Sequence, residues 1–130
     1  MHITVVETPE FLSATSKLLD DEERTSLVEY LASNPAAGTV IPGTGGIRKL
    51  RWGLQGRGKR GGARVIYFFH NLDMPLFMLT AYAKNQREDL SSADYATFRQ
   101  LTVTLVHSFQ SRSLKSGFKS GMHKLQRGKP

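Results

Sequence analysis

The stretch from Ile47 to Phe69 constrains the fold of this chain most strongly, because it combines strand-like alternation with seven basic residues and no carboxylate. Its glycine-rich middle, residues 53–63, separates two segments in which polar and apolar side chains alternate with the period of a β-strand. Glycine permits tight turns and a close approach of the backbone to a ligand. The sequence therefore predicts a β-hairpin, with strands at about 47–52 and 64–70 and a basic loop at its tip that holds polyphosphate.

Charge is distributed unevenly along the 130 residues, whose formal net charge is +7. Residues 1–46 carry a net charge of −5, residues 47–87 carry +8, and residues 88–109 carry −2. Residues 110–130 add six cations and no acid. A basic segment between acidic flanks indicates a site for a polyanion such as nucleic acid. The alternative is a solvated surface that happens to be basic.

Composition and length narrow the class of protein. The length suits a single domain with a modest core. The absence of cysteine excludes a disulfide framework and a thiolate metal site. No apolar run approaches the roughly 20 residues that span a bilayer, and the N-terminus lacks the layout of a signal peptide. We therefore expect a cytoplasmic protein that does not bind membranes.

The N-terminal part predicts a strand followed by two helical segments. Residues 2–6 alternate and are β-branched, which is typical of a strand. Thr8 and Asp20 are candidate N-caps, and Glu23 stands in a capping-box relation to Asp20. The two segments are either separate helices or one bent helical hairpin. The apolar residues expected on their buried faces are Phe11, Leu12, Leu18, Leu19, Leu27, Val28 and Leu31.

The C-terminal part predicts a further strand, a helix and a tail. A strand at about 76–84 would place Met78, Thr80, Tyr82 and Lys84 on one face. Ser91 and Asp94 indicate the start of a helix from about Ser92 to Phe109. Its apolar residues recur at helical spacing, so that it would pack on the sheet: Tyr95, Phe98, Leu101, Leu105 and Phe109. Residues 110–130 are rich in Ser, Gly and Lys and predict a flexible basic tail beyond a domain at 1–109.

Known nucleotide and metal motifs do not fit this chain. A P-loop needs Gly-Lys followed by Ser or Thr, whereas Gly58-Lys59 is followed by Arg60. A dinucleotide-binding loop opens a helix, whereas residues 53–63 lead into a predicted strand. The four histidines have no ligand spacing. We therefore expect neither a cofactor nor a metal.

A metal-free cationic site remains, with Lys49, Arg51, Arg64, Lys84 and Tyr82 as its candidate catalytic residues. Fixed cations can orient a ribose 2′-oxygen in line with the adjacent phosphate and stabilise the charge of the pentacovalent intermediate. A lysine or tyrosine with a perturbed pKa could act as base or acid, and neighbouring cations would lower the pKa of a lysine. The same residues could instead only bind phosphate. The further cations that we expect to contact RNA are Arg48, Arg57, Lys59, Arg60 and Arg87.

Three blocks of this sequence resemble the RelE/HigB-like toxins of bacterial type II toxin–antitoxin systems, within the RelE/ParE superfamily. The blocks are NPAAGTVIPGTGGIRKLRW, GKRGGARVIYFF and LTAYAKNQREDLS. The resemblance covers about residues 1–109. It implies an α+β, RelE-like fold, in which two N-terminal helices and one C-terminal helix pack on a small antiparallel sheet of about four strands.

The resemblance also implies an activity and partners. Such toxins are ribosome-dependent endoribonucleases (mRNA interferases) that cut mRNA in the A site of the 70S ribosome and stop translation and growth. The cut leaves a 2′,3′-cyclic phosphate and a 5′-hydroxyl. The partner would be a cognate antitoxin, a helix-turn-helix HigA-like protein. The toxin would contact operator DNA only through this antitoxin.

Residue by residue, Arg64 matches the family arginine taken to stabilise the phosphate. Lys49 and Arg51 fall on the strand with the basic catalytic residues, and Lys84 matches the basic block after the last strand. Asn85 replaces the arginine of that block. Some members of the family have a tyrosine where this chain has Leu90 and Ser91. Tyr82 would take the role of that tyrosine. The alternatives are a ParE-like inhibitor of DNA gyrase with the same fold and a non-enzymatic nucleic-acid-binding module.

Overall fold

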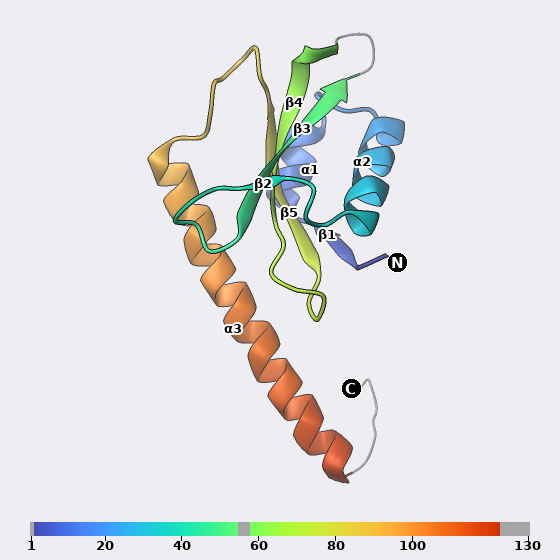
Figure 1. Ribbon diagram of the computed structural model, residues 1–130, viewed down its shortest axis with the longest axis vertical. Helices are drawn as coiled ribbons and strands as arrows, with labels where there is room; N and C mark the ends of the chain where they lie inside the picture. The colour runs from blue at the N-terminus through green and yellow to red at the C-terminus, as the bar shows by residue number, and fades with distance from the viewer. Residues whose placement is uncertain (1, 55–57, 123–130) are drawn as a thin grey trace.

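The computed structural model describes the backbone of residues 2–54 and 58–122, and the side chains of residues 2–53 and 62–111. The chain forms an α+β fold in which helices cover both faces of one sheet (Figure 1), which confirms the predicted fold class. Its elements are β1 (Val5–Glu7), α1 (Pro9–Thr15), α2 (Asp21–Ser33), β2 (Thr39–Val40), β3 (Ile47–Leu54), β4 (Gly58–Phe68), β5 (Leu76–Ala83) and α3 (Ser92–Met122).

The sheet has five strands in the order β1-β5-β4-β3-β2. The strands from β2 to β5 pair antiparallel with their neighbours, whereas β1 runs parallel to β5. The sequence predicts an antiparallel sheet of about four strands. The observed sheet differs from this prediction in the short strand β2 and in the parallel pair of β1 and β5. Since β1 and β5 are more than 60 residues apart in the sequence, no local pattern specifies their relative direction.

The first two helices begin where the sequence predicts. Thr8 Oγ1 accepts a hydrogen bond from the Phe11 N–H, and Asp20 and Glu23 form a complete capping box. The helices are separate, which decides between the two alternatives left open above. The short α1 ends before Leu18, and Leu12 is 42% exposed, so the prediction that Leu12 is buried was wrong.

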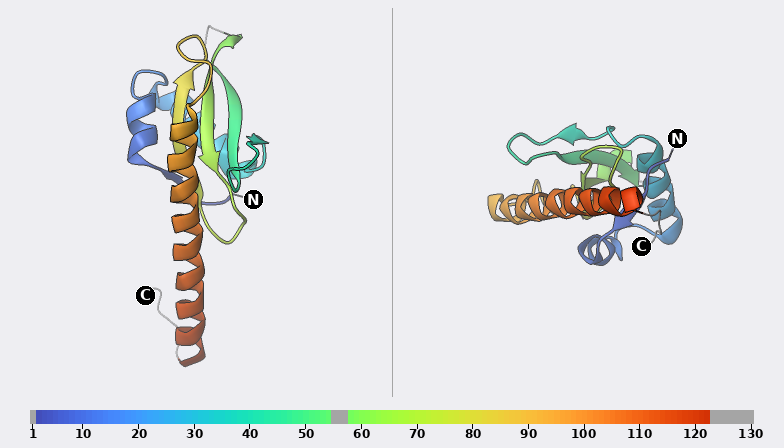
Figure 2. Two further views of the ribbon diagram at one scale, coloured as in Figure 1. Left: turned by 90° about the vertical axis from the view of Figure 1, so that its left-hand side faces the viewer. Right: turned by 90° about the horizontal axis from the view of Figure 1, so that it is seen from below.

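Two apolar layers form on opposite faces of the sheet (Figure 2). The first lies under α1 and α2 and centres on Phe11, Leu27, Leu31, Val65 and Tyr67. The second lies under α3 and includes Ile47, Ile66, Phe68, Leu79 and Leu90. Because neighbouring residues of a strand point to opposite faces, the register of the sheet decides which face carries the basic residues.

The helix α3 starts at the predicted position and ends later than expected. Ser91 and Asp94 cap its first turn through two reciprocal hydrogen bonds. It continues past Phe109 to Met122 and extends well beyond the sheet (Figure 1), so the predicted end at 109 was wrong. Extending an existing helix is far less costly than starting one, which lets a polar sequence continue it. The domain boundary at 109 stays a prediction, and residues 123–130 lie outside the described part.

Two further details differ from the sequence analysis. The strands β3 and β4 reach Leu54 and Gly58, so most of the expected 53–63 loop is strand. Leu101 is 37% exposed on α3 rather than buried. Within the described residues, no helix is long and apolar enough to cross a membrane.

Candidate nucleic-acid site

A row of three polar side chains crosses the α3-facing side of the sheet. Arg51 of β3 lies directly opposite Arg64 of β4, which in turn lies directly opposite Tyr82 of β5. Residues paired in this way in antiparallel strands share a face, with Cβ atoms about 5 Å apart. Lys49 lies two residues before Arg51 and therefore on the same face. We refer to these four residues, together with Lys84, as the basic site.

Lys84 directly follows β5 and continues its pairing with β4. Its backbone N–H donates a hydrogen bond of 3.1 Å to the Gly62 carbonyl. By alternation from Tyr82, its side chain belongs to the same face of the sheet. Four of the predicted catalytic residues therefore lie on one face of three adjacent strands, and Lys84 follows directly after the third of them. Leu50 and Trp52 pack on the opposite layer, as the alternation predicted.

Not every residue of the predicted strand at 76–84 shares that face. The pairing of β4 with β5 shifts between Ile66 and Tyr67, so that Met78 lies opposite Tyr67. Met78 consequently packs in the layer under α1 and α2, whereas Tyr82 packs under α3. The prediction that Met78 shares a face with Tyr82 and Lys84 was wrong, because it assumed an unbroken period of two.

Arg64 is the buried cation of the basic site. The residue is 8% exposed, and its Nη1 atom is buried without a hydrogen-bond partner among the described residues. A buried donor without an acceptor costs free energy, and a charged one costs more. Two arginines directly opposite one another also repel. An anion between Arg51 and Arg64 would remove both penalties.

The two lysines of the basic site pair with carboxylates of the loop between β5 and α3. Lys49 Nζ lies 2.9 Å from Asp89 Oδ1, and Lys84 Nζ lies 3.1 Å from Glu88 Oε1. All four side chains are partly exposed, and Glu88 is almost fully exposed. Solvent screens such pairs, so each adds little stability. Among the described residues the two arginines have no carboxylate partner, which leaves the positive potential of the site centred on Arg51 and Arg64.

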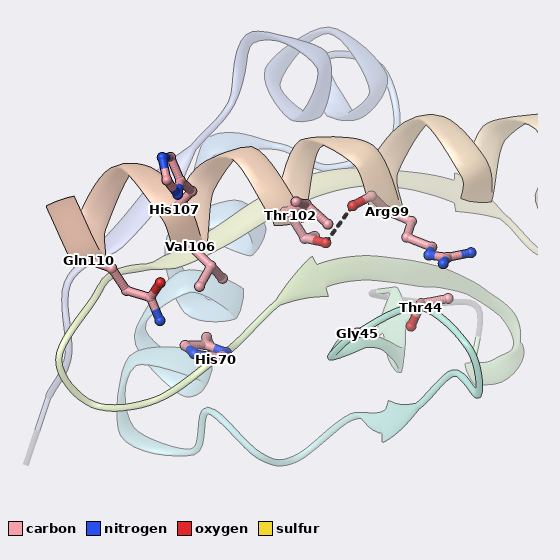
Figure 3. Close-up of a pocket in the computed structure, with 9 residues that line it drawn as sticks. Thr44, Gly45, His70, Arg99, Thr102, Val106, His107 and Gln110 are labelled. Atoms are coloured by element: carbon pink, nitrogen blue, oxygen red, sulfur yellow. Dashed lines mark hydrogen bonds between the residues drawn. The ribbon is translucent and has the colours of Figure 1, made fainter.

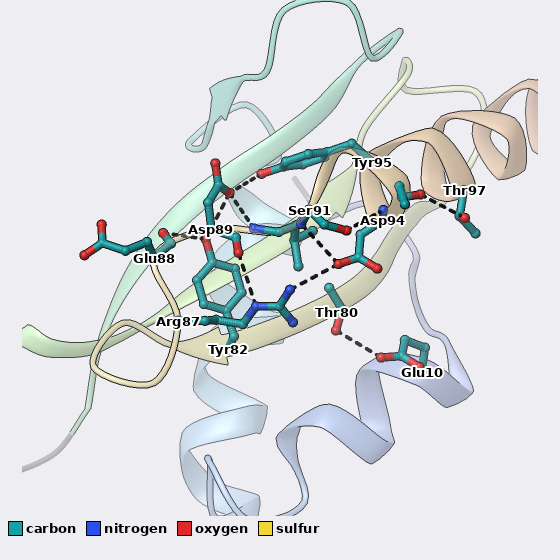
Figure 4. Close-up of polar contacts among 12 residues, drawn as sticks. Glu10, Thr80, Tyr82, Arg87, Glu88, Asp89, Ser91, Asp94, Tyr95 and Thr97 are labelled. Atoms are coloured by element: carbon teal, nitrogen blue, oxygen red, sulfur yellow. Dashed lines mark hydrogen bonds and ion pairs between the residues drawn. The ribbon is translucent and has the colours of Figure 1, made fainter.

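Asp89 accepts four hydrogen bonds on a single oxygen, and Figure 4 shows those from Tyr82 and Tyr95. The donors to Oδ1 are Lys49 Nζ at 2.9 Å, the Tyr82 hydroxyl at 3.3 Å, the Tyr95 hydroxyl at 2.6 Å and the Leu90 N–H at 2.8 Å. Partial burial alone would raise the pKa of Asp89, but the hydrogen bonds from Tyr95, Lys49 and Leu90 lower that pKa to about 2. Asp89 is therefore ionised across the physiological pH range.

Tyr82 stays protonated in the same range. Burial raises the pKa of its hydroxyl to about 12, and the adjacent charge and hydrogen bond of Asp89 act in the same direction. The guanidinium of Arg87 lies 5.7 Å from the centre of the Tyr82 ring. A hydroxyl with a raised pKa is a hydrogen-bond donor rather than a base. In the basic site, Tyr82 can therefore donate a proton or a hydrogen bond.

The predicted RNA contacts are not all brought to this face. Arg48 Nη1 donates to the carbonyls of Ala36, at 3.1 Å, and Gly38, at 2.7 Å. Because Arg48 alternates with Lys49 along β3, it lies on the opposite face. Arg87 borders the basic site, where it binds Asp94 at 3.1 Å. Arg57 lies outside the described residues, as do the side chains of Lys59 and Arg60.

Sequence reasoning missed two residues of the site, Asp89 and Tyr95. Tyr95 belongs to the apolar stripe of α3 and was assigned only to the core. Asp89 stands in a loop without a known motif. The available signal was an acidic pair, Glu88-Asp89, directly after the basic block that ends β5.

A separate pocket of about 380 Å³ lies between α3 and two loops (Figure 3). Its polar lining includes His70, Arg99, His107 and Gln110, and none of the predicted site residues contributes to it. Across the described residues, no group of three or more His, Cys, Asp or Glu side chains could hold a metal ion.

Comparison with known proteins gives two findings. A family model described as the RelE toxin of the RelE/RelB toxin–antitoxin system matches residues 14–124, which is more than half of the chain. The chain is also similar to a solved structure of E. coli toxin RelE, an arginine-to-alanine double mutant in the free state. That similarity has a TM-score of 0.49 and 17% sequence identity, and it covers 68% of this chain and 90% of the other.

Proposed function

This chain belongs to the RelE family of toxin–antitoxin toxins, and we propose that it is a metal-independent endoribonuclease that cleaves translated mRNA on the ribosome. One observation carries the proposal: the buried Nη1 of Arg64, directly opposite Arg51, has no acceptor among the residues that the structure describes. A phosphodiester supplies the acceptor oxygens and the negative charge that this arrangement lacks. Arginine is well suited to bind two phosphate oxygens at once.

The proposed reaction is an internal transfer. The ribose 2′-oxygen attacks the adjacent phosphorus, the bond from phosphorus to the 5′-oxygen breaks, and the products are a 2′,3′-cyclic phosphate and a 5′-hydroxyl. Arg64 and Arg51 bind the non-bridging oxygens, whose charge grows in the transition state. The Tyr82 hydroxyl, whose single proton is bonded to Asp89 in the free protein, would donate that proton to the leaving oxygen once RNA is bound. Lys49 or Lys84 would accept the proton of the 2′-hydroxyl from its neutral amine form, because an ammonium has no lone pair for it.

The family membership supports further partners. We propose a cognate antitoxin of the helix-turn-helix, HigA-like kind, which alone brings the toxin to operator DNA. We also propose the A site of the 70S ribosome as the place of cleavage, in the cytoplasm. The positive charge of residues 47–87 suits a site lined by RNA phosphates.

The proposal is tested with purified toxin on ribosomes that carry a defined mRNA. Wild type should yield discrete cuts with 5′-hydroxyl ends, and Arg64→Ala should reduce cleavage by roughly 100-fold or more, as loss of a transition-state donor does. Arg99→Ala is the matched control, because Arg99 is exposed on α3 and lines a different pocket. A supercoiling assay runs in parallel. Inhibited gyrase without mRNA cuts would favour the ParE-like alternative, and neither effect would favour a binding module.

A further inference from the structure

We propose that Asp89 and Tyr95 are positioning residues of this site: Tyr95 fixes the Asp89 carboxylate, which in turn orients Lys49 and Tyr82 beside Arg64. The inference rests on the proposed function, since it concerns how the same site is held ready for RNA. It also gives a functional role to the first turn of α3, which carries Tyr95.

The geometry joins three separate elements at one atom. Asp89 Oδ1 receives Lys49 Nζ from β3, the Tyr82 hydroxyl from β5 and the Tyr95 hydroxyl from α3. The Tyr95 bond is the shortest of these, at 2.6 Å. The Asp89 side chain is 49% exposed, so a role in core packing does not explain its contacts. An acceptor that serves three elements fixes their relative positions more tightly than a single surface ion pair does.

The loop that carries Asp89 is itself anchored to α3. Leu90 packs in the apolar layer under α3, and the Leu90 N–H donates to Asp89. The Arg87 Nε donates to the Asp89 carbonyl at 3.2 Å, while its Nη2 binds Asp94 in the first turn of α3. The position of the Asp89 carboxylate is therefore set by the start of α3 rather than by the strands.

The arrangement leaves the basic residues able to bind substrate. A lysine ammonium has three donors, and Asp89 occupies one donor of Lys49. The other two remain for a phosphate oxygen. The single proton of Tyr82 is bonded to Asp89 in the free protein, so Asp89 holds this hydroxyl in place while its ring packs under α3, and the leaving oxygen would take over that bond. The two free donors of Lys49 are preorganised, and such donors stabilise a transition state without a cost of reorientation.

Several charged groups face Tyr82 and must be held constant in a test. Besides Asp89 they are Arg64 from β4 and Arg87 from the loop, and the titratable Tyr95 hydroxyl of α3 shares the Asp89 oxygen. Asp89→Asn removes the charge at nearly constant volume. Tyr95→Phe removes only the hydroxyl. Asp89→Glu restores the charge and serves as the conservative variant. Tyr30→Phe is the matched tyrosine control, because Tyr30 lies on α2 and packs against Trp52.

The experiment combines a titration with kinetics. Nuclear magnetic resonance of ¹³Cζ-labelled tyrosine follows the Tyr82 hydroxyl in wild type and in each variant, with Tyr82→Phe assigning the signal. In Asp89→Asn, loss of the neighbouring charge should move the Tyr82 titration roughly one pH unit lower. Single-turnover cleavage on ribosomes should slow by roughly 10–100-fold in Asp89→Asn and Tyr95→Phe, with KM little changed. Asp89→Glu should recover part of the rate, and Tyr30→Phe should match wild type.

The experiment distinguishes failure of the proposed function from failure of the positioning role. If wild type cleaves no RNA, the proposed function is overturned, and the role of Asp89 in that reaction goes with it. If wild type cleaves and both Asp89→Asn and Tyr95→Phe retain the wild-type rate and Tyr82 titration, only the positioning role is overturned. Thermal melts identify any variant that loses its fold. If either Asp89→Asn or Tyr95→Phe does not fold, the other of these two variants tests the positioning role.

Discussion

Arg51 and Arg64 lie directly opposite one another on neighbouring antiparallel strands, although like charges in such a pair repel. Arg64 is the buried member, and its Nη1 has no partner in the described part of the chain, while Arg51 is exposed. An arrangement that lowers the stability of the free protein and suits a bound anion is typical of a functional site. The predictions below follow from this pair and from the groups around it.

Removing the charge of Arg64 should stabilise the free protein. In Arg64→Met a flexible apolar chain of similar length replaces a buried guanidinium whose Nη1 meets no acceptor within residues 2–53 and 62–111. Replacing buried charge with apolar volume is often neutral or stabilising, and we expect the free energy of unfolding to rise by about 1 kcal/mol or more. Urea unfolding measures this change. A clear loss of stability would mean that Arg64 supports the fold, with the site as a secondary role.

Tyr82→Phe should reduce cleavage with little effect on folding. The substitution removes a hydroxyl that stays protonated up to about pH 12, and keeps the ring that packs under α3. Loss of a proton donor slows such reactions by roughly 100-fold or more. Single-turnover cleavage on ribosomes measures the rate. An unchanged rate would exclude Tyr82 as the donor to the leaving oxygen.

Stability should fall in acid partly through Asp89. The hydrogen bonds from Tyr95, Lys49 and Leu90 hold the pKa of Asp89 at about 2 in the folded protein, below its ordinary value of 3.8. A lowered folded pKa gives a stabilising contribution that is present above the unfolded pKa and is lost as pH falls from about 4 to about 2. Asp94, whose pKa is also lowered, acts in the same direction.

Unfolding measured from pH 7 to pH 2 tests this contribution. Asp89→Asn should show a shallower loss of stability below pH 4 than wild type, because it has no proton to take up at this position. Equal slopes in the two proteins would show that the hydrogen bonds to Asp89 do not persist in solution.

Gly38→Ala should destabilise the fold. A Cβ at Gly38 would lie 2.8 Å from Tyr67 Cε1 and 3.0 Å from the Lys49 carbonyl oxygen. The Tyr67 hydroxyl accepts from the Gly38 N–H and donates to the Pro35 carbonyl, so this ring cannot move without breaking both bonds. We expect a loss of about 1–3 kcal/mol. Gly53→Ala is the control, since a Cβ there meets no described atom within 4 Å.

The parts of the fold that sequence predicted are those specified within a few residues. The caps at Thr8, Asp20 and Ser91 are local hydrogen bonds between residues three apart, so the pattern alone reveals them. The basic face of β3 also followed from simple alternation. The end of α3 and the parallel direction of β1 depend on distant partners or on helix extension, and neither leaves a local signal.

In the candidate site, too, only the residues that local sequence specifies could be predicted. Lys49, Arg51 and Arg64 were predicted because the hairpin itself places them together. Asp89 and Tyr95 reach the site through the packing of α3 on the sheet, a contact between elements that periodicity cannot specify. Met78 was placed on the wrong face because a shift in the pairing of β4 and β5 interrupts the alternation.

The most direct test of the central claim is to map mRNA 5′ ends in cells after induced expression of wild type and of Arg64→Met. If the basic site cleaves RNA, wild type should arrest growth and produce new 5′-hydroxyl ends inside translated frames, while the folded Arg64→Met protein should produce neither. Growth arrest with the same cuts in the variant would contradict the account, because cleavage would then not depend on the buried arginine.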